Sequence, residues 1–323
     1  MPQNPVSSDA ARGDDGTEMI RKGRYKDREA VIVESKTLRA TLLPQDGAKM
    51  ASLIDLENGK ELLAVRKSEQ YRVLTYSGNY VDAECSAFDD LFPTIDPYSP
   101  RSGVYQGIPY PDHGEWCRIP FTVQTEDDRV IFSAKSHRFP MRYQKSVSVA
   151  PNGGISLRYS IANDGDEPFD FIWAGHIMLQ GEDEMRLITP FEPNAPVEMV
   201  FATDGYPQNT LPLDTLTGFD PGIGAAYKFY YLDRIKEGTF SVRYADGREL
   251  SFRYDAAKLP YLGVWLNNGE FQGIYNLAPE PCTAPFDSPE RAAQKGYGSK
   301  IAAKSVLEFE IDISVEKKES RNE

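Results

Sequence analysis

The chain has 323 residues, a formal net charge of −13 and a pI near 4.9. This acidity argues against a general affinity for nucleic acid, whose phosphates attract stripes of lysine and arginine. The 40% of hydrophobic residues can bury a sizeable core, and because no apolar run approaches about 18 residues we expect no membrane partner.

The N-terminal segment, residues 1–20, is rich in Pro, Ser, Asp and Gly and predicts a disordered tail. It lacks the apolar stretch of a signal peptide. The three cysteines, Cys85, Cys117 and Cys282, lie far apart, form no CxxC pair and suit a reducing compartment. We therefore expect a cytoplasmic protein whose ordered structure begins near Tyr25.

Short runs of β-branched and aromatic residues follow, many with period-two alternation. Asn-Gly and Asp-Gly pairs separate several of them, as in antiparallel hairpins. Without βαβ alternation, an internal repeat or a linker-like composition, residues 21–318 predict one all-β domain, a large antiparallel β-sandwich, with a closed barrel as the alternative. The clearest runs are 30–34, 37–43, 129–135, 143–150, 154–163, 239–245, 249–254, 261–267 and 306–315.

The segment 76–100 combines aromatic, acidic and proline residues and is interpreted as one long loop, a feature that is often functional in compact domains. Its candidates for binding the hydroxyl groups of a ligand are Asn79, Asp89 and Asp90. Ordinary turn acids explain these residues equally well.

His113 lies in PYPDHGEWCRIPF, a loop-like stretch that we expect to run into a strand. Nearby Asp112, Glu115 and Trp116 favour a ligand-binding rim, and we take His113 and Trp116 as binding candidates. The alternative is a surface histidine beside two carboxylates.

His176 lies in PFDFIWAGHIMLQ, where strand alternation puts it on one face with Ala174 and Met178. Imidazole titrates near neutral pH, so a partly buried His176 could act as a general acid. A core histidine satisfied by one hydrogen bond is the alternative. His137 has basic neighbours, and we assign it no role.

Glu280 follows an apolar run and stands between Pro279 and Pro281. Pro281 confines Glu280 to extended backbone angles, which would aim the carboxylate in a fixed direction, as suits a general base. Alternatively, the prolines end a strand and Glu280 is solvated. Lys228, in AAYKFYYLD, is similarly compatible with a binding or a structural role.

A short helix is predicted at Ser288–Lys295, where Ser288 can cap the N-terminus, Pro289 suits the first turn and Glu290 favours the positive end of the helix dipole. The chain has no Walker A run, no GxGxxG after a strand, no HExxH and no GxSxG. A three-histidine zinc site lacks a short ligand pair. We therefore expect neither a cofactor nor a metal.

Taken together, several segments resemble the aldose 1-epimerase, or galactose mutarotase-like, family in their order along the chain. They are LLPQDGAKMASLIDLENGKELL at 42–63, FDDLFPTI at 88–95, DHGEW at 112–116, GHIML at 175–179 and LAPEPCTAPFDS at 277–288. The resemblance implies the large β-sandwich (supersandwich) of that family and an isomerase that interconverts the α and β anomers of a monosaccharide.

The resemblance also implies roles for individual residues. Glu280 would be the general base, His176 the general acid and His113 a ligand of the anomeric or ring oxygen, while Asp89 and Asp90 fall in a matching active-site stretch. This acid–base chemistry requires neither metal nor nucleotide.

Two departures from the family pattern leave the substrate open. Ile177 and Met178 follow His176 where galactose mutarotases have an aromatic pair, and the sugar-binding aspartate has no counterpart unless Asp233 or Lys228 takes its place. The alternatives are a hexose-6-phosphate 1-epimerase, which would need an Arg or Lys cluster at the cleft mouth, and a non-catalytic carbohydrate-binding protein.

Overall fold

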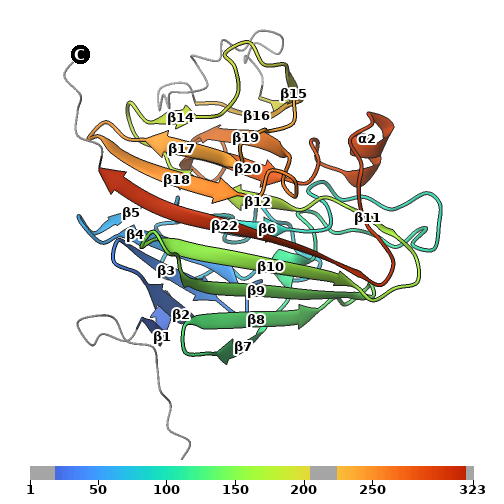
Figure 1. Ribbon diagram of the computed structural model, residues 1–323, viewed down its shortest axis with the longest axis horizontal. Coiled ribbons are helices and arrows are strands. Elements are labelled where there is room, and N and C mark those ends of the chain that lie inside the picture. Colours follow the sequence, from blue (N-terminus) through green and yellow to red (C-terminus); the bar gives the residue numbers. More distant parts are fainter. Residues whose placement is uncertain (1–18, 204–223, 318–323) are drawn as a thin grey trace, which may run out of the picture.

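The computed structural model describes residues 19–203 and 224–317 (Figure 1). Within them, two large antiparallel sheets enclose the main hydrophobic core. The larger sheet is 12-stranded and runs β1 (Ile20–Tyr25), β2 (Arg28–Glu34), β3 (Leu38–Leu43), β4 (Lys49–Asp55), β6 (Phe88–Leu91), β12 (Ala174–Ile177), β20 (Tyr275–Cys282), β19 (Tyr261–Asn268), β16 (Ala226–Tyr231) and β15 (Val197–Ala202), with β5 (Lys60–Glu61) against β4 and β13 (Leu179–Gln180) against β20.

The second sheet of the described residues is 8-stranded, and Figure 1 shows its long strands side by side. It runs β14 (Arg186–Ile188), β17 (Thr239–Arg243), β18 (Arg248–Tyr254), β22 (Ser305–Lys317), β10 (Ile155–Asn163), β9 (Met141–Val149), β8 (Arg129–Lys135) and β7 (Thr122–Thr125). A small ribbon joins β11 (Phe169–Phe171) to β21 (Ser299–Ile301).

Alternation within the strands decides which side chains enter the core between the two sheets. In β9, Met141, Tyr143, Lys145 and Val147 are buried, while Arg142 and Gln144 are exposed. The lysine in this apolar row is paired, because its Nζ lies 2.7 Å from Oδ2 of a carboxylate on β6. The fold therefore accepts a charge in its core only with a counter-ion.

The predicted β-sandwich is confirmed, and all nine runs predicted as strands fall within or largely overlap observed strands. The predicted short helix is also confirmed as α2 (Pro289–Gln294), with the Ser288 side chain accepting a hydrogen bond from the Arg291 amide at 3.2 Å. No helix of the described residues is long and apolar enough to cross a membrane.

Three expectations differ from the structure. Ordered structure begins at β1, ahead of Tyr25, and residues 1–18 of the expected tail lie outside the described part of the chain. Segment 76–100 is not a single loop, because β6 lies inside it. The stretch that carries His113 runs into a strand, β7, as expected, and passes through a 3₁₀ turn, η1 (Trp116–Arg118), on the way.

The third difference concerns Glu280, which lies inside β20 and not after it. Pro279 and Pro281 are part of this central strand and are paired with β19. Because they are alternate residues, their missing amide donors face the same neighbouring strand, and Glu280 between them keeps its own donor. The strand therefore continues through Pro279 and Pro281, although prolines normally end a strand.

Candidate active site

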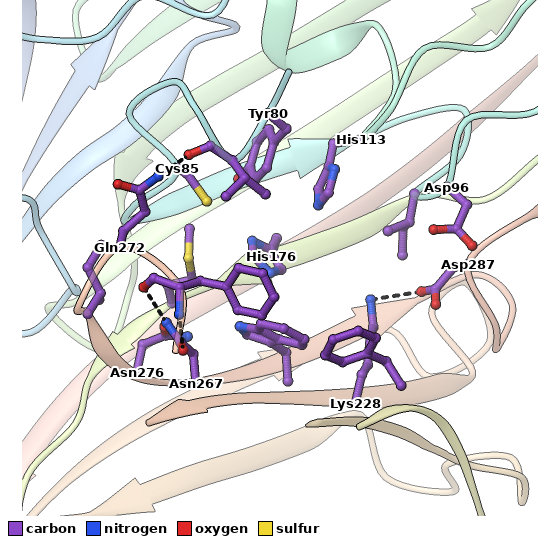
Figure 2. A pocket seen from close by; sticks show the side chains of 17 residues that line it. Tyr80, Cys85, Asp96, His113, His176, Lys228, Asn267, Gln272, Asn276 and Asp287 are labelled. Carbon is purple, nitrogen blue, oxygen red and sulfur yellow. Dashed lines mark hydrogen bonds and ion pairs between the residues drawn. The ribbon is translucent and has the colours of Figure 1, made fainter. Parts of the chain in front are cut away.

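A cavity of about 200 Å³ lies over the face of the larger sheet that points away from the core between the sheets (Figure 2). We call this side of the sheet, which carries His176, the cavity face, and the side that carries Asp90 the core face. The cavity combines polar side chains with an aromatic wall. Its polar lining is Asp96, His113, His176, Lys228, Asn267, Gln272, Asn276 and Asp287, and its aromatic lining is Tyr80, Phe201, Trp265 and Phe271.

Strand register brings His176 and Glu280 together. Ala174 pairs with Cys282, so the antiparallel arrangement places His176 level with Glu280 on the cavity face. The His176 Nε2 and Glu280 Oε1 atoms are 3.4 Å apart. On the other side of Glu280 the paired residue is Gly263, where a Cβ atom would lie 2.7 Å from the Tyr230 ring. Glycine therefore lets the Tyr230 ring pack beside the carboxylate.

Glu280 lies directly behind the cavity wall. It is fully buried and does not line the cavity itself, but it contacts His176 and Lys228, which do. Lys228 Nζ is 2.9 Å from Oε2, within ion-pair distance. Burial raises the pKa of Glu280, and the Lys228 charge opposes this shift without cancelling it.

Lys228 bridges two carboxylates at the edge of the cavity. Its Nζ atom also lies 2.8 Å from Asp287 Oδ1, which accepts a 2.8 Å hydrogen bond from the Tyr230 hydroxyl. Burial would lower the pKa of Lys228, but the carboxylates of Asp287 and Glu280 outweigh it and raise the pKa. The ammonium is therefore held charged between two counter-ions.

His176 is in the opposite electrostatic position. Burial lowers its pKa well below the usual range, and electrostatic interactions with His113, Lys228 and Lys49 lower it further. Its Nδ1 atom has no hydrogen-bond partner within the described ranges. Glu280 and His176 thus have pKa values that burial moves towards each other.

His113 faces the same cavity from a loop. Its backbone adopts a φ of +57°, and its amide donates a 2.6 Å hydrogen bond to the Ile95 carbonyl. The next residue, Gly114, has a φ of +75°, and a Cβ there would lie 2.2 Å from the Phe92 carbonyl oxygen, so only glycine lets the loop approach this closely. The His113 Nδ1 atom is 2.8 Å from an Asp112 carboxylate oxygen.

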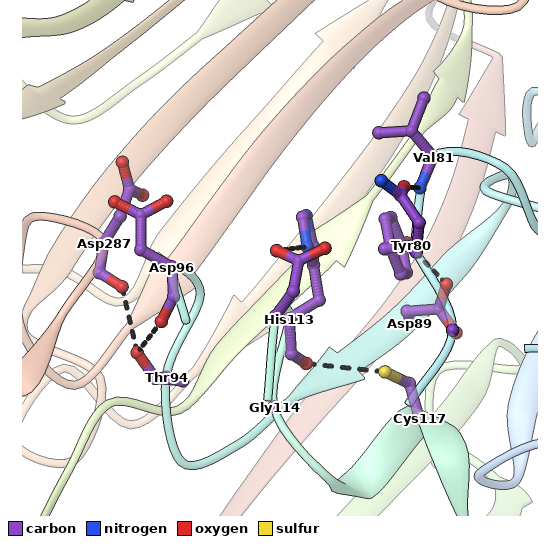
Figure 3. A network of polar contacts seen from close by, with 12 residues as sticks. Tyr80, Val81, Asp89, Thr94, Asp96, His113, Gly114, Cys117 and Asp287 are labelled. Carbon is purple, nitrogen blue, oxygen red and sulfur yellow. Dashed lines mark hydrogen bonds and ion pairs between the residues drawn. The ribbon is translucent and has the colours of Figure 1, made fainter. Parts of the chain in front are cut away.

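Tyr80 connects this loop to the sheet (Figure 3). Its ring stacks on His113 with centroids 3.8 Å apart, and its hydroxyl donates a 2.7 Å hydrogen bond to Asp89. The same Asp89 oxygen lies 2.8 Å from Lys49 Nζ. Asp89 is therefore engaged beneath Tyr80 and does not line the cavity.

No family model matches the sequence, and no curated protein matches it. Solved structures do match. A galactose mutarotase-like protein from Clostridium acetobutylicum has a TM-score of 0.65 and 14% identity, covering 93% of this chain and 98% of that one. A galactose mutarotase-like protein from Lactobacillus casei has a TM-score of 0.60 and 16% identity, covering 89% and 100%. The GalM/aldose epimerase homologue from C. elegans has a TM-score of 0.57 and 15% identity, covering 88% and 98%.

The chain has the galactose mutarotase-like fold. At this identity the likeness extends to the fold, and the candidate site depends on this chain's own residues. Of the residues singled out from the sequence, the structure gathers His113, His176 and Lys228 on the cavity wall, with Glu280 behind it.

Other predicted residues lie elsewhere in this galactose mutarotase-like fold. Asp90 points to the core face and pairs with Lys145, and Trp116 is fully buried, with its indole N–H donating to the Gly47 carbonyl. Asn79 is exposed, and its side chain accepts hydrogen bonds from two following backbone amides in a local turn. Together with Asp89, these residues are not among those lining the cavity.

The sequence reasoning missed several residues that line the cavity. Asp287 stands in the same quoted segment as Glu280, so the family-like stretch contained it without marking it. Trp265 and Asn276 lie on strands that flank or contain Glu280, and their alternation with Gly263 and Glu280 was the available signal. No group of three or more metal-ligating side chains is placed to hold a metal in the described ranges.

Proposed function

We propose that this chain is an aldose 1-epimerase that interconverts the α and β anomers of a free aldose. The observation that carries the proposal is the contact between Glu280 and His176 at the wall of one cavity, with His113 facing the same space. The sugar mutarotase names borne by proteins of similar fold add support.

The reaction needs a base and an acid at one hemiacetal. Glu280 takes the proton of the C1 hydroxyl while the C1–ring-oxygen bond breaks, and His176 delivers a proton to the ring oxygen. The products are the open-chain aldehyde, a protonated carboxyl and a neutral imidazole. After rotation about C1–C2, the two groups exchange roles and close the ring on the other face of C1.

The electrostatics of the pair suit this exchange. The reaction transfers one proton to Glu280 and one from His176, so its driving force depends on the gap between their pKa values. Burial raises the pKa of Glu280 and lowers that of His176. Both shifts favour the protonated carboxyl and neutral imidazole that the proton transfer produces over the ionised pair from which it starts.

His113 would hold the substrate oxygen that changes charge. Asp112 engages its Nδ1 atom, and stacking on Tyr80 fixes the plane of the ring. A histidine whose Nδ1 is fixed in this way presents Nε2 to a ligand. In the proposed reaction, this nitrogen contacts the anomeric or ring oxygen.

The charges of the cavity favour a free aldose over a sugar phosphate. Lys228 is the lone lysine or arginine in its described lining, and Glu280 and Asp287 neutralise it. Asp96 adds a further carboxylate to the wall. The Arg or Lys cluster that a phosphate would need is not found among these lining residues.

Exchange NMR at anomeric equilibrium tests the proposal with D-galactose, D-glucose, D-xylose and D-glucose 6-phosphate. We expect a protein-dependent exchange rate for at least one free aldose that exceeds the rate for the phosphate. Acceleration of the phosphate alone would select the hexose-6-phosphate epimerase instead. Calorimetric binding of a sugar without acceleration would select a carbohydrate-binding protein.

A further inference from the structure

Four residues before Glu280, β20 carries a second polar group on the cavity face. This residue, Asn276, lines the cavity, and its side chain shares a face with Glu280 because the two positions are separated by an even number of residues. At about 3.3 Å per residue, their backbones are about 13 Å apart. His176 is level with Glu280, so Asn276 lies at the end of the cavity remote from the acid–base pair.

The wall between these ends is apolar. Ala278 lies midway along β20, where it is buried and packed with Met178 and Trp265 rather than lining the cavity. It pairs with Trp265, while the Leu179–Leu277 pair places Met178 level with it on the other side. Trp265 and Met178 both line the cavity. These two side chains give the middle of the cavity an apolar surface that the C–H face of a sugar ring can contact.

The Asn276 side chain has an unpaired hydrogen-bond donor within the described residues. It is 1% exposed, and its Nδ2 atom has no partner within residues 19–203 and 224–317. Its neighbour on β19 provides a contrast. Asn267 pairs with Asn276, but its Nδ2 donates to the Phe271 carbonyl and its Oδ1 accepts from the Phe271 amide, each at 2.9 Å. Asn267 closes a turn, whereas Asn276 has a buried amide directed into the cavity.

We propose that Asn276 determines sugar specificity by hydrogen-bonding a ring hydroxyl remote from the anomeric carbon, at C4 or its neighbour C3. The inference rests on the proposed function for the identity of the ligand. Subtracting a hydrogen bond of about 2.8 Å at each end from the spacing of about 13 Å leaves about 7 Å, which suits one pyranose ring with its terminal oxygens.

A hydroxyl is the matching partner for this amide. It can donate to the carboxamide oxygen or accept from Nδ2, so either orientation of the Asn276 side chain is satisfied. A sugar lacking that hydroxyl would leave the buried amide unpaired, and sites of this kind reject such analogues strongly. Asn276 would thus read the sugar while Glu280 and His176 act on C1.

The test combines substrate and side-chain deletions. Exchange NMR gives kcat/KM for D-glucose and D-galactose and for their 2-, 3- and 4-deoxy derivatives, with wild-type protein and with Asn276→Leu. We expect a loss of about 10-fold for the 3-deoxy or 4-deoxy sugar with wild type. We also expect Asn276→Leu to lower turnover of the parent sugar by a similar factor and to abolish that deoxy penalty.

Gln180→Leu is the matched control, because Gln180 pairs with Asn276 across β13 and β20 but does not line the cavity. It should keep the full deoxy penalty. If Asn276→Leu does not fold, Asn276→Ala takes its place. If Asn276→Leu still shows the full deoxy penalty, so that the losses from the sugar and from the side chain multiply, the inference is overturned.

The outcome for Asn276 can be separated from the outcome for the proposed function. NMR titration with the same sugars measures binding without any turnover. If no sugar is anomerised but the 3- or 4-deoxy binding penalty disappears with Asn276→Leu, the epimerase proposal fails and the role of Asn276 stands. If sugars are anomerised but Asn276→Leu leaves the deoxy penalty unchanged in both binding and turnover, the epimerase proposal stands and the role of Asn276 fails.

Discussion

On β6, the adjacent residues Asp89 and Asp90 point to opposite faces of the larger sheet, and each carboxylate meets a lysine. Asp90 faces the core and lies 2.7 Å from Lys145, with both side chains fully buried. On the cavity face, Asp89 lies below Tyr80 and pairs in register with His176 on β12. Glu280 lies level with His176 on the next strand, β20.

The two faces differ in whether the groups around the carboxylate can contact a ligand. The Asp90–Lys145 pair is sealed between the sheets, so its contribution is to the stability and specificity of the fold. Glu280 has an imidazole and an ammonium beside it, and both line a cavity that a ligand can enter. The same chemical group is sealed in the core on one face and lies directly behind the cavity wall on the other, where we propose that it acts as the base.

The largest expected effect is on the cavity face. Glu280→Gln should lower kcat/KM for anomerisation by about 10²–10⁴-fold, because the amide keeps the shape of the carboxylate but cannot accept the C1 hydroxyl proton. Exchange NMR measures the rate. Glu57→Gln, at an exposed position, is the control and should leave the rate unchanged. Activity of Glu280→Gln close to wild type would place the base elsewhere.

On the core face the expected loss is one of stability. Asp90→Asn leaves the buried Lys145 charge without its counter-ion and should lower the free energy of unfolding by about 3–5 kcal/mol, as measured by denaturant titration. Activity per folded molecule should stay at the wild-type level. Replacing both residues, Asp90→Leu with Lys145→Met, should recover much of the stability. A loss of activity without a loss of stability would reverse the assignment of the two faces.

A shift in pH dependence should be smaller. The acid limb of kcat/KM reports ionisation of Glu280, and because burial raises this pKa the limb should lie at higher pH than for an ordinary glutamate. Lys228→Met removes the charge that opposes the shift, so the acid limb should move to still higher pH. An acid limb that moves to lower pH would contradict the ion pair between Lys228 and Glu280.

The smallest effect is expected for Tyr80, which connects Asp89 to His113. Tyr80→Phe removes the hydroxyl that donates to Asp89 but keeps the ring that stacks on His113. Loss of one such hydrogen bond, about 1 kcal/mol, should raise KM about 5-fold with little change in kcat. Tyr98→Phe, away from the cavity lining, is the control. An unchanged KM would mean that stacking alone positions His113.

The sequence predicted nine of the observed strands as clear runs because alternation and turns are local properties. The short strand β6 escaped detection, since Phe88–Leu91 has one acid for each face of the sheet and so shows no hydrophobic alternation. Glu280 was placed after a strand because the prolines beside it normally end one. In both cases, pairing with strands distant in sequence overrides the local signal.

The candidate site was predictable to a similar degree. His113, His176 and Glu280 were identifiable by residue type and by their resemblance to a family pattern, whereas the positions of Asp89 and Asp90 were not. Their partners, Lys49 and Lys145, come from other strands, and nothing in the sequence assigns a lysine to either. Which face of the sheet each carboxylate points to is a matter of register, and this is set by the whole sheet.

The most direct test of the account is a double-mutant comparison of the two groups on the cavity face. Exchange NMR would measure anomerisation by Glu280→Gln, His176→Asn and the double variant, with thermal melts confirming that each is folded. If the two groups move protons as one unit, the double variant should be about as slow as the slower single variant. Losses that multiply would contradict a shared acid–base step between Glu280 and His176.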